Sequence, residues 1–397
     1  MCQVYRIAAS RCSSAPTKKS ASLVLADILD EDFRHAVIAR GTPRLIAIYF
    51  FTYRYIERSM SPSSRYPLWL CLCLLGAAML IALLVGRYSI SLAEFSRFIL
   101  QPLGLADLPI SRARLLHSLI IDARLPRVIA AVLVGAGLSV SGAAYQAVFR
   151  NPLVSPGLLG VLSGCAFGAA LGIIWHWQAL PIALLACVTG LIAVAVGVGI
   201  AQMFQTSSIL LLVLGGIVAN ALFTSLLSMT QYIADPVDQL PSIVYWLLGS
   251  LSAVDQHTLM WIAPVLATAI VMLCLGGRAI DALSLSDDEA YSLGVPVQKI
   301  RYGVIVLATL ICALTVSLAG MVGWIGLLVP HLARLLVGPS NVRLLPVSAC
   351  LGGVFLLAAD GVARSVSAGE IPLGIITELF GAIAFVLVLH RVRKGWL

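Results

Sequence analysis

The chain has 397 residues, of which 60% are apolar and only 11% are charged. Soluble globular proteins carry about 25% charged residues, so this composition excludes an ordinary soluble domain and indicates a polytopic membrane protein. The net charge of +8 does not indicate nucleic-acid binding, because the basic residues lie between apolar runs and near the chain ends instead of forming one stripe.

The first 66 residues form a polar extension whose longest apolar stretch, residues 45 to 51, is too short to span a membrane. Three interpretations stay open: a disordered segment, an interfacial helix, or a translation start at Met60. In each case we expect residues 67 to 397 to form the transmembrane domain, and a chain that begins at Met60 should still insert and function.

Apolar runs of sufficient length predict an all-α fold with about ten transmembrane helices. An apolar piece at residues 240 to 250 is too short to cross and is expected to pack as a half-helix at one surface. The even number of spans puts both termini on one side of the membrane. The spans are predicted near residues 67 to 86, 126 to 149, 156 to 175, 181 to 203, 208 to 230, 257 to 276, 300 to 320, 324 to 338, 343 to 365 and 373 to 390.

The span at residues 126 to 149 is predicted to occupy the centre of the bundle. It contains many small residues, which let neighbouring backbones approach closely in lipid. We expect the chain to enter this helix through a turn at Arg124-Leu125-Pro126-Arg127 and to leave it at Arg150-Asn151-Pro152, where proline stops helix continuation.

The positive-inside rule places both termini in the cytoplasm, because most short-loop Lys and Arg residues then lie inside. The loop after the first span is an exception that needs another explanation, since it would lie outside and is basic. Its arginines are Arg87, Arg97, Arg112, Arg114, Arg124 and Arg127.

The inside loop at residues 278 to 301 contains a predicted short surface helix. Asp287, Asp288 and Glu289 suit the N-terminal end of a helix, and Gly294 before a Val-Pro pair suits the turn that ends it. A solvated loop without a helix is the alternative interpretation.

Few ionisable residues lie within the predicted spans. Asp360 and Arg364 are spaced for an i, i+4 ion pair, and His331 beside Arg334 is interpreted as a structural histidine, because no second ligand accompanies it. The sequence therefore predicts no catalytic residue and no metal site, and it favours neither a membrane enzyme nor an ion-coupled secondary transporter.

Six motifs in the chain resemble, in order and spacing, the FecCD family of type II ABC importer permeases, which includes the cobalamin, haem and ferric-siderophore permeases. The resemblance covers roughly residues 67 to 394. The motifs are RLPR at 124 to 127, SGAAYQAVFRNPLVSPGLLG at 141 to 160, YWLLGSLS at 245 to 252, EAYSLG at 289 to 294, GWIGLLVPHLAR at 323 to 334, and the run from LLAADGVAR to IPLGIITELFGA at 356 to 382.

The resemblance implies a bacterial inner-membrane, multi-pass permease that pairs with a second permease copy, two cytoplasmic ATP-binding subunits and a periplasmic binding protein. It implies roles for three groups of residues. The cytoplasmic gate would comprise Asn151, Leu153, Thr206 and Ser207; the ATPase-coupling residues would be Asp287, Asp288, Glu289, Ala290, Leu293 and Gly294; the residues that dock the binding protein would be Arg124, Arg127 and Arg364.

The chain is expected to bind no cofactor, and ATP with Mg would be used by the partner ATPase. A P-loop requires Gly-Lys followed by Ser or Thr, and none of the four lysines follows a glycine. The expected cargo is a bulky iron-bearing ligand, haem or a ferric siderophore, with cobalamin or an oxyanion as alternatives. Homodimer and paired heterodimer both stay open.

Overall fold

The computed structural model describes residues 66–86, 88–105, 107–204, 209–252, 254–366 and 369–393. The predicted polar extension up to residue 65, with Met60, lies outside the described residues. Over the described ranges the chain forms helices and no strand, which confirms the all-α prediction. The described residues within 66–290 and 296–393 form one compact unit, and every side-chain contact given below lies within it.

Ten apolar helices in the described ranges match the ten predicted spans. Six of them include a segment long and apolar enough to cross a membrane: α7 (Leu125–Val148), α9 (Ala179–Met203), α10 (Ile209–Ile233), α12 (Gln256–Leu275), α15 (Val297–Ala319) and α17 (Asn341–Ser365). Shorter apolar helices occupy the other four positions: α4 (Tyr66–Leu84), α8 (Val161–Ile174), α16 (Ile325–Val337) and α18 (Leu373–Arg393).

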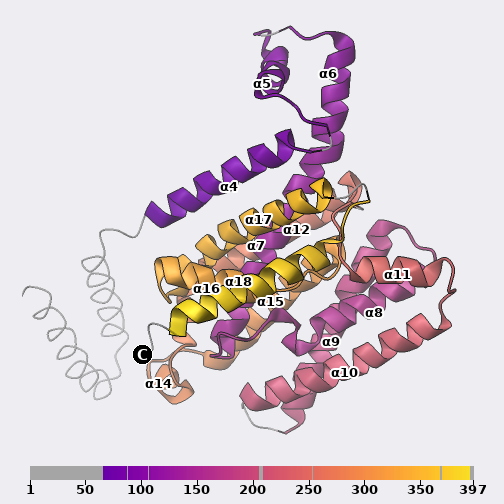
Figure 1. Ribbon diagram of the computed structural model, residues 1–397. Coiled ribbons are helices and arrows are strands. Elements are labelled where there is room, and N and C mark those ends of the chain that lie inside the picture. Colours follow the sequence, from indigo (N-terminus) through magenta and orange to yellow (C-terminus); the bar gives the residue numbers. More distant parts are fainter. Residues whose placement is uncertain are drawn as a thin grey trace, which may run out of the picture. The chain divides into compact units, whose positions relative to one another are not determined.

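Short helices lie at the two ends of this bundle. The half-helix expected at residues 240 to 250 is α11 (Gln239–Leu247), and the predicted surface helix is α14 (Asp287–Ser292), which follows α13 (Gly277–Ala282). Figure 1 shows α11 at one end of the bundle and the segment leading into α14 at the other. We call these the α11 end and the α13 end.

The segment after α4 is helical, although the sequence predicted a loop there. It contains α5 (Leu92–Leu100), η1 (Gln101–Leu103), α6 (Ile110–His117) and the π-helical η2 (Ser118–Arg124), and η2 continues directly into α7. The capping box between Ser91 and Glu94 starts α5.

The predicted turn at residues 124 to 127 is wrong, because Arg124 and Leu125 both have right-handed helical conformations. Pro126 lies near the start of α7, directly after the π-helical turn η2, and the proline ring fixes φ at about −65°, which is compatible with a helix. The wide turn before it, in which the Leu125 N–H donates to the Ile120 carbonyl, joins α6 to α7 without a break.

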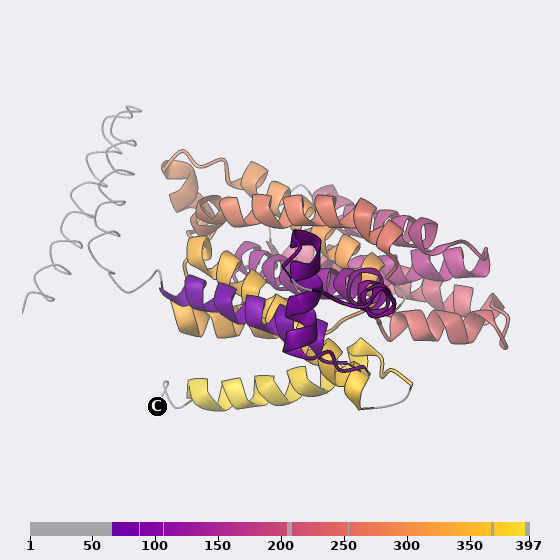
Figure 2. The same ribbon diagram turned by 90° about the horizontal axis from the view of Figure 1, so that it is seen from above.

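The helix α7 lies in the interior of the bundle, as predicted, and packs against α15, α16 and α17. Figure 2 shows it between neighbouring helices, with α18 along one edge. A Cβ atom on Gly135 would collide with the backbone of Gly352 in α17, and one on Gly142 would collide with the backbone of Gly326 in α16. Glycine is therefore what allows these backbones to approach so closely.

Candidate coupling, gate and docking sites

Two of the four predicted gate residues, Asn151 and Leu153, follow the end of α7. Arg150 has a left-handed conformation with φ of 49°, and the Asn151 side chain accepts a 2.9 Å hydrogen bond from the Leu153 backbone N–H. Leu153 is exposed, with 62% of its surface accessible. Thr206 and Ser207 lie outside the described residues, so the gate assignment of all four residues stays a prediction.

The predicted coupling residues start at the N-terminus of α14, which is capped by side-chain hydrogen bonds. Glu289 accepts a 3.1 Å hydrogen bond from the Ser286 backbone N–H, and the Ser286 hydroxyl accepts one of 3.3 Å from the Glu289 N–H. These reciprocal bonds form a capping box that orders the first turn of α14. Ala290 is fully buried, and Gly294 has the positive φ of 76° expected of a residue that ends the turn.

Asp287 joins this segment to two membrane helices. Its Oδ1 atom lies 2.6 Å from Nη2 of Arg150, just after α7, and 2.8 Å from Nη2 of Arg301 in α15. Burial raises the pKa of Asp287, but hydrogen bonds from Arg301 and Arg150 outweigh this effect and lower the pKa below its ordinary value. The carboxylate is therefore ionised at neutral pH.

Asp281 joins the same segment to a third membrane helix. It accepts hydrogen bonds of 2.7 and 2.8 Å from the backbone and side-chain amides of Asn341, and one of 2.9 Å from the Ser340 hydroxyl. Asn341 is the first residue of α17. We call residues 277–290 the coupling segment; Asp281 and Asp287 connect it to residues at the ends of α7, α15 and α17.

A second ion-pair network lies at the α11 end. The predicted pair is confirmed, since Arg364 Nε lies 3.0 Å from Asp360 Oδ2. Arg127 joins the same carboxylate at 2.8 Å and also pairs with Glu370 at 2.9 Å. Sequence reasoning missed these partners of Arg127 because they lie 233 and 243 residues away, where no spacing rule applies.

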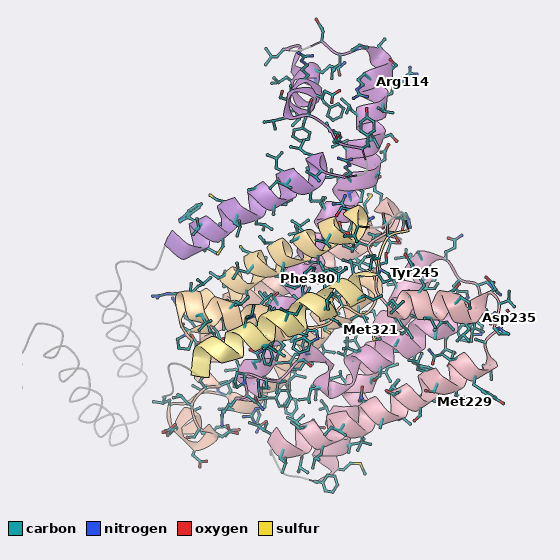
Figure 3. The ribbon with its side chains drawn as sticks, viewed as in Figure 1. Arg114, Met229, Asp235, Tyr245, Met321 and Phe380 are labelled. Carbon is teal, nitrogen blue, oxygen red and sulfur yellow. The ribbon has the colours of Figure 1, made fainter. Side chains whose placement is uncertain are left out.

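Arg124, another predicted docking residue, is also engaged within the chain. It is only 8% exposed, and its guanidinium donates to the backbone carbonyls of Leu83, Leu84 and Tyr88. In contrast, Arg97 and Arg114 are exposed and have no ion pair among the described residues. Figure 3 shows Arg114 on α6.

The helix α10 exposes a polar stripe. Only 28% of the 18-residue apolar stretch of α10 is buried, which is the lowest share among the six long candidate spans in the described ranges. Asn220, Thr224 and Ser228 are exposed and recur every four residues, so they share one side of the helix. Met229, which is 66% exposed, lies beside them on the open side of α10 (Figure 3).

Comparison with known proteins identifies one family. The model of the FecCD transport family matches residues 73–391. The molybdate import system permease protein MolB of Haemophilus influenzae is 36% identical over 324 residues, which cover 81% of this chain and 94% of that protein. The hemin transport system permease protein HmuU of Yersinia pestis is 36% identical over 282 residues, covering 69% and 84% respectively.

A solved structure shares the fold. It is described as an inward-facing conformation of a putative metal-chelate type ABC transporter, and it matches with a TM-score of 0.73 and 34% identity over 82% of this chain and 98% of that chain. The family match extends over most of the described helices, from α4 to α18. The chain therefore belongs to the FecCD transport family.

Proposed function

We propose that this chain is the non-catalytic permease subunit of a binding-protein-dependent ABC importer in the bacterial inner membrane. The observation that carries the proposal is the coupling segment, whose Asp281 and Asp287 contact the ends of three membrane helices. A partner ATPase that moved this segment would pull on α7, α15 and α17 together. Under the positive-inside rule the α13 end faces the cytoplasm, where ATP is available.

The polar stripe on α10 supports the proposal that a second permease copy packs against this helix. Asn220 and Thr224 lie near the middle of a membrane span, where exposure to lipid would leave their polar groups unsatisfied at a cost of about 1 to 3 kcal/mol each. A second copy facing this stripe would remove it from lipid and enclose a cargo path of hydroxyl and amide groups between the two chains. Cargo would then cross by alternating access, powered by ATP on the partner subunits.

Cross-linking tests this pairing. Thr224→Cys should give a dimer of twice the chain mass with a short bifunctional maleimide. Leu222→Cys, about 200° around the same helix, is the matched control and should stay monomeric. Cross-linking at Leu222 but not at Thr224 would place the second copy on another face.

The binding protein is proposed to dock at the α11 end, in the region of Arg124, Arg127 and Arg364. An acidic partner would explain why this end is basic against the positive-inside rule. Because those three arginines hold intrachain contacts, exposed Arg97 and Arg114 are added as residues that steer the partner by charge.

The proposed cargo is a bulky iron-bearing ligand, haem or a ferric siderophore. Similar permeases named for iron chelatin and hemin transport support this proposal. The exposed face of α10 also has no charged side chain among its described residues. A molybdate-type oxyanion is the second candidate, because the molybdate permease MolB is similar over 94% of its own length.

Reconstitution tests the function and the cargo together. The chain should co-purify with a separate ATPase, and proteoliposomes with the cognate binding protein should take up haem or a ferric siderophore only when ATP is supplied. Uptake of molybdate alone would show that the cargo is an oxyanion and not an iron-bearing ligand. Uptake driven by an ion gradient without ATP would overturn the importer assignment.

A further inference from the structure

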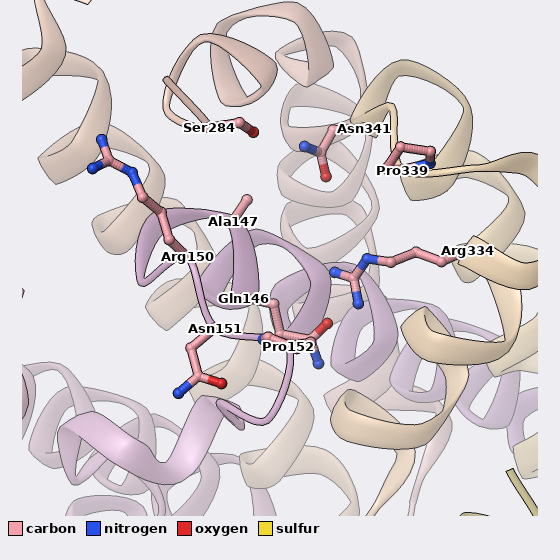
Figure 4. A pocket seen from close by; sticks show the side chains of 9 residues that line it. All are labelled: Gln146, Ala147, Arg150, Asn151, Pro152, Ser284, Arg334, Pro339 and Asn341. Atoms are coloured by element: carbon pink, nitrogen blue, oxygen red, sulfur yellow. The ribbon is translucent and has the colours of Figure 1, made fainter. Parts of the chain in front are cut away.

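A pocket of about 220 Å³ lies at the α13 end, where α7, α16, α17 and the coupling segment meet. Figure 4 shows the lining side chains, with the Arg334 guanidinium pointing across the pocket toward the end of α7. Since a water molecule occupies about 30 Å³ in the liquid, the pocket has room for a small ion and accompanying water. The lining residues are Gln146, Ala147, Arg150, Asn151, Pro152, Ser284, Arg334, Pro339 and Asn341.

Arg334 carries a positive charge that nothing in the described chain neutralises. Its side chain is half-buried, its Nη1 atom is shielded from solvent, and it has no hydrogen bond or ion pair with any described residue. The C-terminal dipole of α16 offsets such a charge only in part, because it amounts to about half an elementary charge. A partly buried guanidinium without a counter-ion is less stable than a fully hydrated one, so the site favours a negative ligand.

The acidic residues around the pocket are already engaged. No carboxylate is among the lining residues. Asp287 is paired with Arg150 and Arg301, and Asp281 accepts its hydrogen bonds from Ser340 and Asn341. The local charge of the pocket is therefore positive.

Polar groups that suit an anion surround Arg334. The Gln146 amide nitrogen makes only a long 3.4 Å hydrogen bond to the Gly326 carbonyl, and its Oε1 atom is buried without a partner. A rotation of this amide would direct the nitrogen into the pocket as a donor. The hydroxyl of Ser284 and the side chain of Asn151 offer further donors from the opposite walls.

We propose that this pocket binds one small tetrahedral oxyanion of the phosphate, sulfate or molybdate class, with Arg334 as its principal ligand. The anion would bridge the end of α16, the end of α7 and the coupling segment, and so hold these elements in one arrangement. The site does not depend on the cargo proposed above. Its ligand has two sources, free phosphate of the cytoplasm or an oxyanion delivered by transport.

Equilibrium binding on the full chain tests the proposal. The chain is placed in nanodiscs of neutral phosphatidylcholine, and binding of labelled phosphate, sulfate and molybdate is measured at low and high salt. Wild type should bind one anion per chain, and Arg334→Gln should weaken binding about tenfold or more, as expected for the loss of a charge-assisted hydrogen bond. The matched control is Arg278→Gln, an exposed arginine of α13 that does not line the pocket, and it should bind like wild type.

A second variant keeps the test decisive if Arg334→Gln does not fold. Ser284→Asp adds a carboxylate to the pocket from an exposed position and should abolish binding, whereas Ser284→Ala should retain most of it. Tighter binding of phosphate would identify the cytoplasmic source, and tighter binding of molybdate the transported one. The proposal is overturned if wild type shows no saturable binding of any of the three anions, or if Arg334→Gln and Ser284→Asp both bind as wild type does. Neither result would alter the ATP dependence of uptake on which the importer assignment rests.

Discussion

Arg150 and Asp287 are 137 residues apart in the chain, yet the guanidinium of one lies 2.6 Å from the carboxylate of the other. Arg150 lies two residues after α7, which has the largest buried share among the long candidate spans in the described ranges, and Asp287 begins the short helix that the family resemblance assigns to ATPase coupling. The contact gives a direct route by which movement of the coupling segment reaches the residues predicted to form the gate.

Replacing Asp287 should uncouple transport and destabilise the protein. In Asp287→Asn, Arg301 would lose its ionic partner although it is only 1% exposed, at an expected cost of about 1 to 3 kcal/mol. Uptake should fall more than ATPase binding. The measurement is ATP-driven uptake in proteoliposomes, with thermal unfolding beside it.

Asp288 provides the matched control for this prediction. It is the next residue in the same helix turn, and it has no ion pair or hydrogen bond among the described residues. Asp288→Asn should therefore keep stability, and a loss of uptake in this variant would report only the contact with the ATPase that the family resemblance implies. Equal effects of the two substitutions would show that the charge of the turn matters and the connection through Asp287 does not.

Gly294 should tolerate asparagine better than valine. Its φ of 76° lies in the left-handed region, which costs most side chains about 1 to 2 kcal/mol and is most strained for a β-branched residue. Gly294→Val should lower ATP-driven uptake while membrane insertion stays normal, and Gly294→Asn should lie between it and wild type. If Gly294→Val leaves both uptake and ATPase binding unchanged, the coupling assignment is wrong.

Gly142 should be intolerant of even one added methyl group. A Cβ atom there would collide with the backbone of Gly326, which cannot move aside as a flexible side chain can. Gly142→Ala should cost about 1 to 3 kcal/mol of stability, measured as a lower yield and a lower unfolding temperature in detergent. The control is Gly303→Ala in α15, where no atom lies within 4 Å of the added Cβ, so that substitution should be neutral or stabilising.

Substitutions of the arginines at the α11 end should distinguish a role in docking the binding protein from a role in folding. The double reversal Arg124→Glu with Arg127→Glu should weaken binding-protein affinity far more than either change alone, and should also lower stability because both side chains hold intrachain contacts. Arg97→Glu with Arg114→Glu should weaken affinity and its salt dependence without lowering stability, since both side chains are exposed. Affinity of the purified transporter for its binding protein is measured at low and high salt, with basal ATPase activity as the folding control. Unchanged affinity in both double variants would mean that these arginines do not dock a partner.

The sequence alone determined the class of fold and most element positions. Ten apolar runs predicted the positions of ten apolar helices in the described ranges, six of which are long enough to cross about 30 Å of hydrocarbon. The half-helix α11, the short helix α14, the left-handed Gly294 and the pair of Asp360 with Arg364 were also predictable, since each follows from a local rule of spacing or conformation.

Only the tertiary structure decided which distant residues meet. The continuous helix from α6 through Pro126 depends on a π-helical turn that the prediction did not anticipate. The partners of Arg127, Arg150 and Asp281 lie in other helices, and the unpaired Arg334 became visible only when its surroundings were known. Local rules act over one or two helical turns, whereas ion pairing and burial depend on how whole helices pack, and for that reason the candidate sites could not be completed from the sequence.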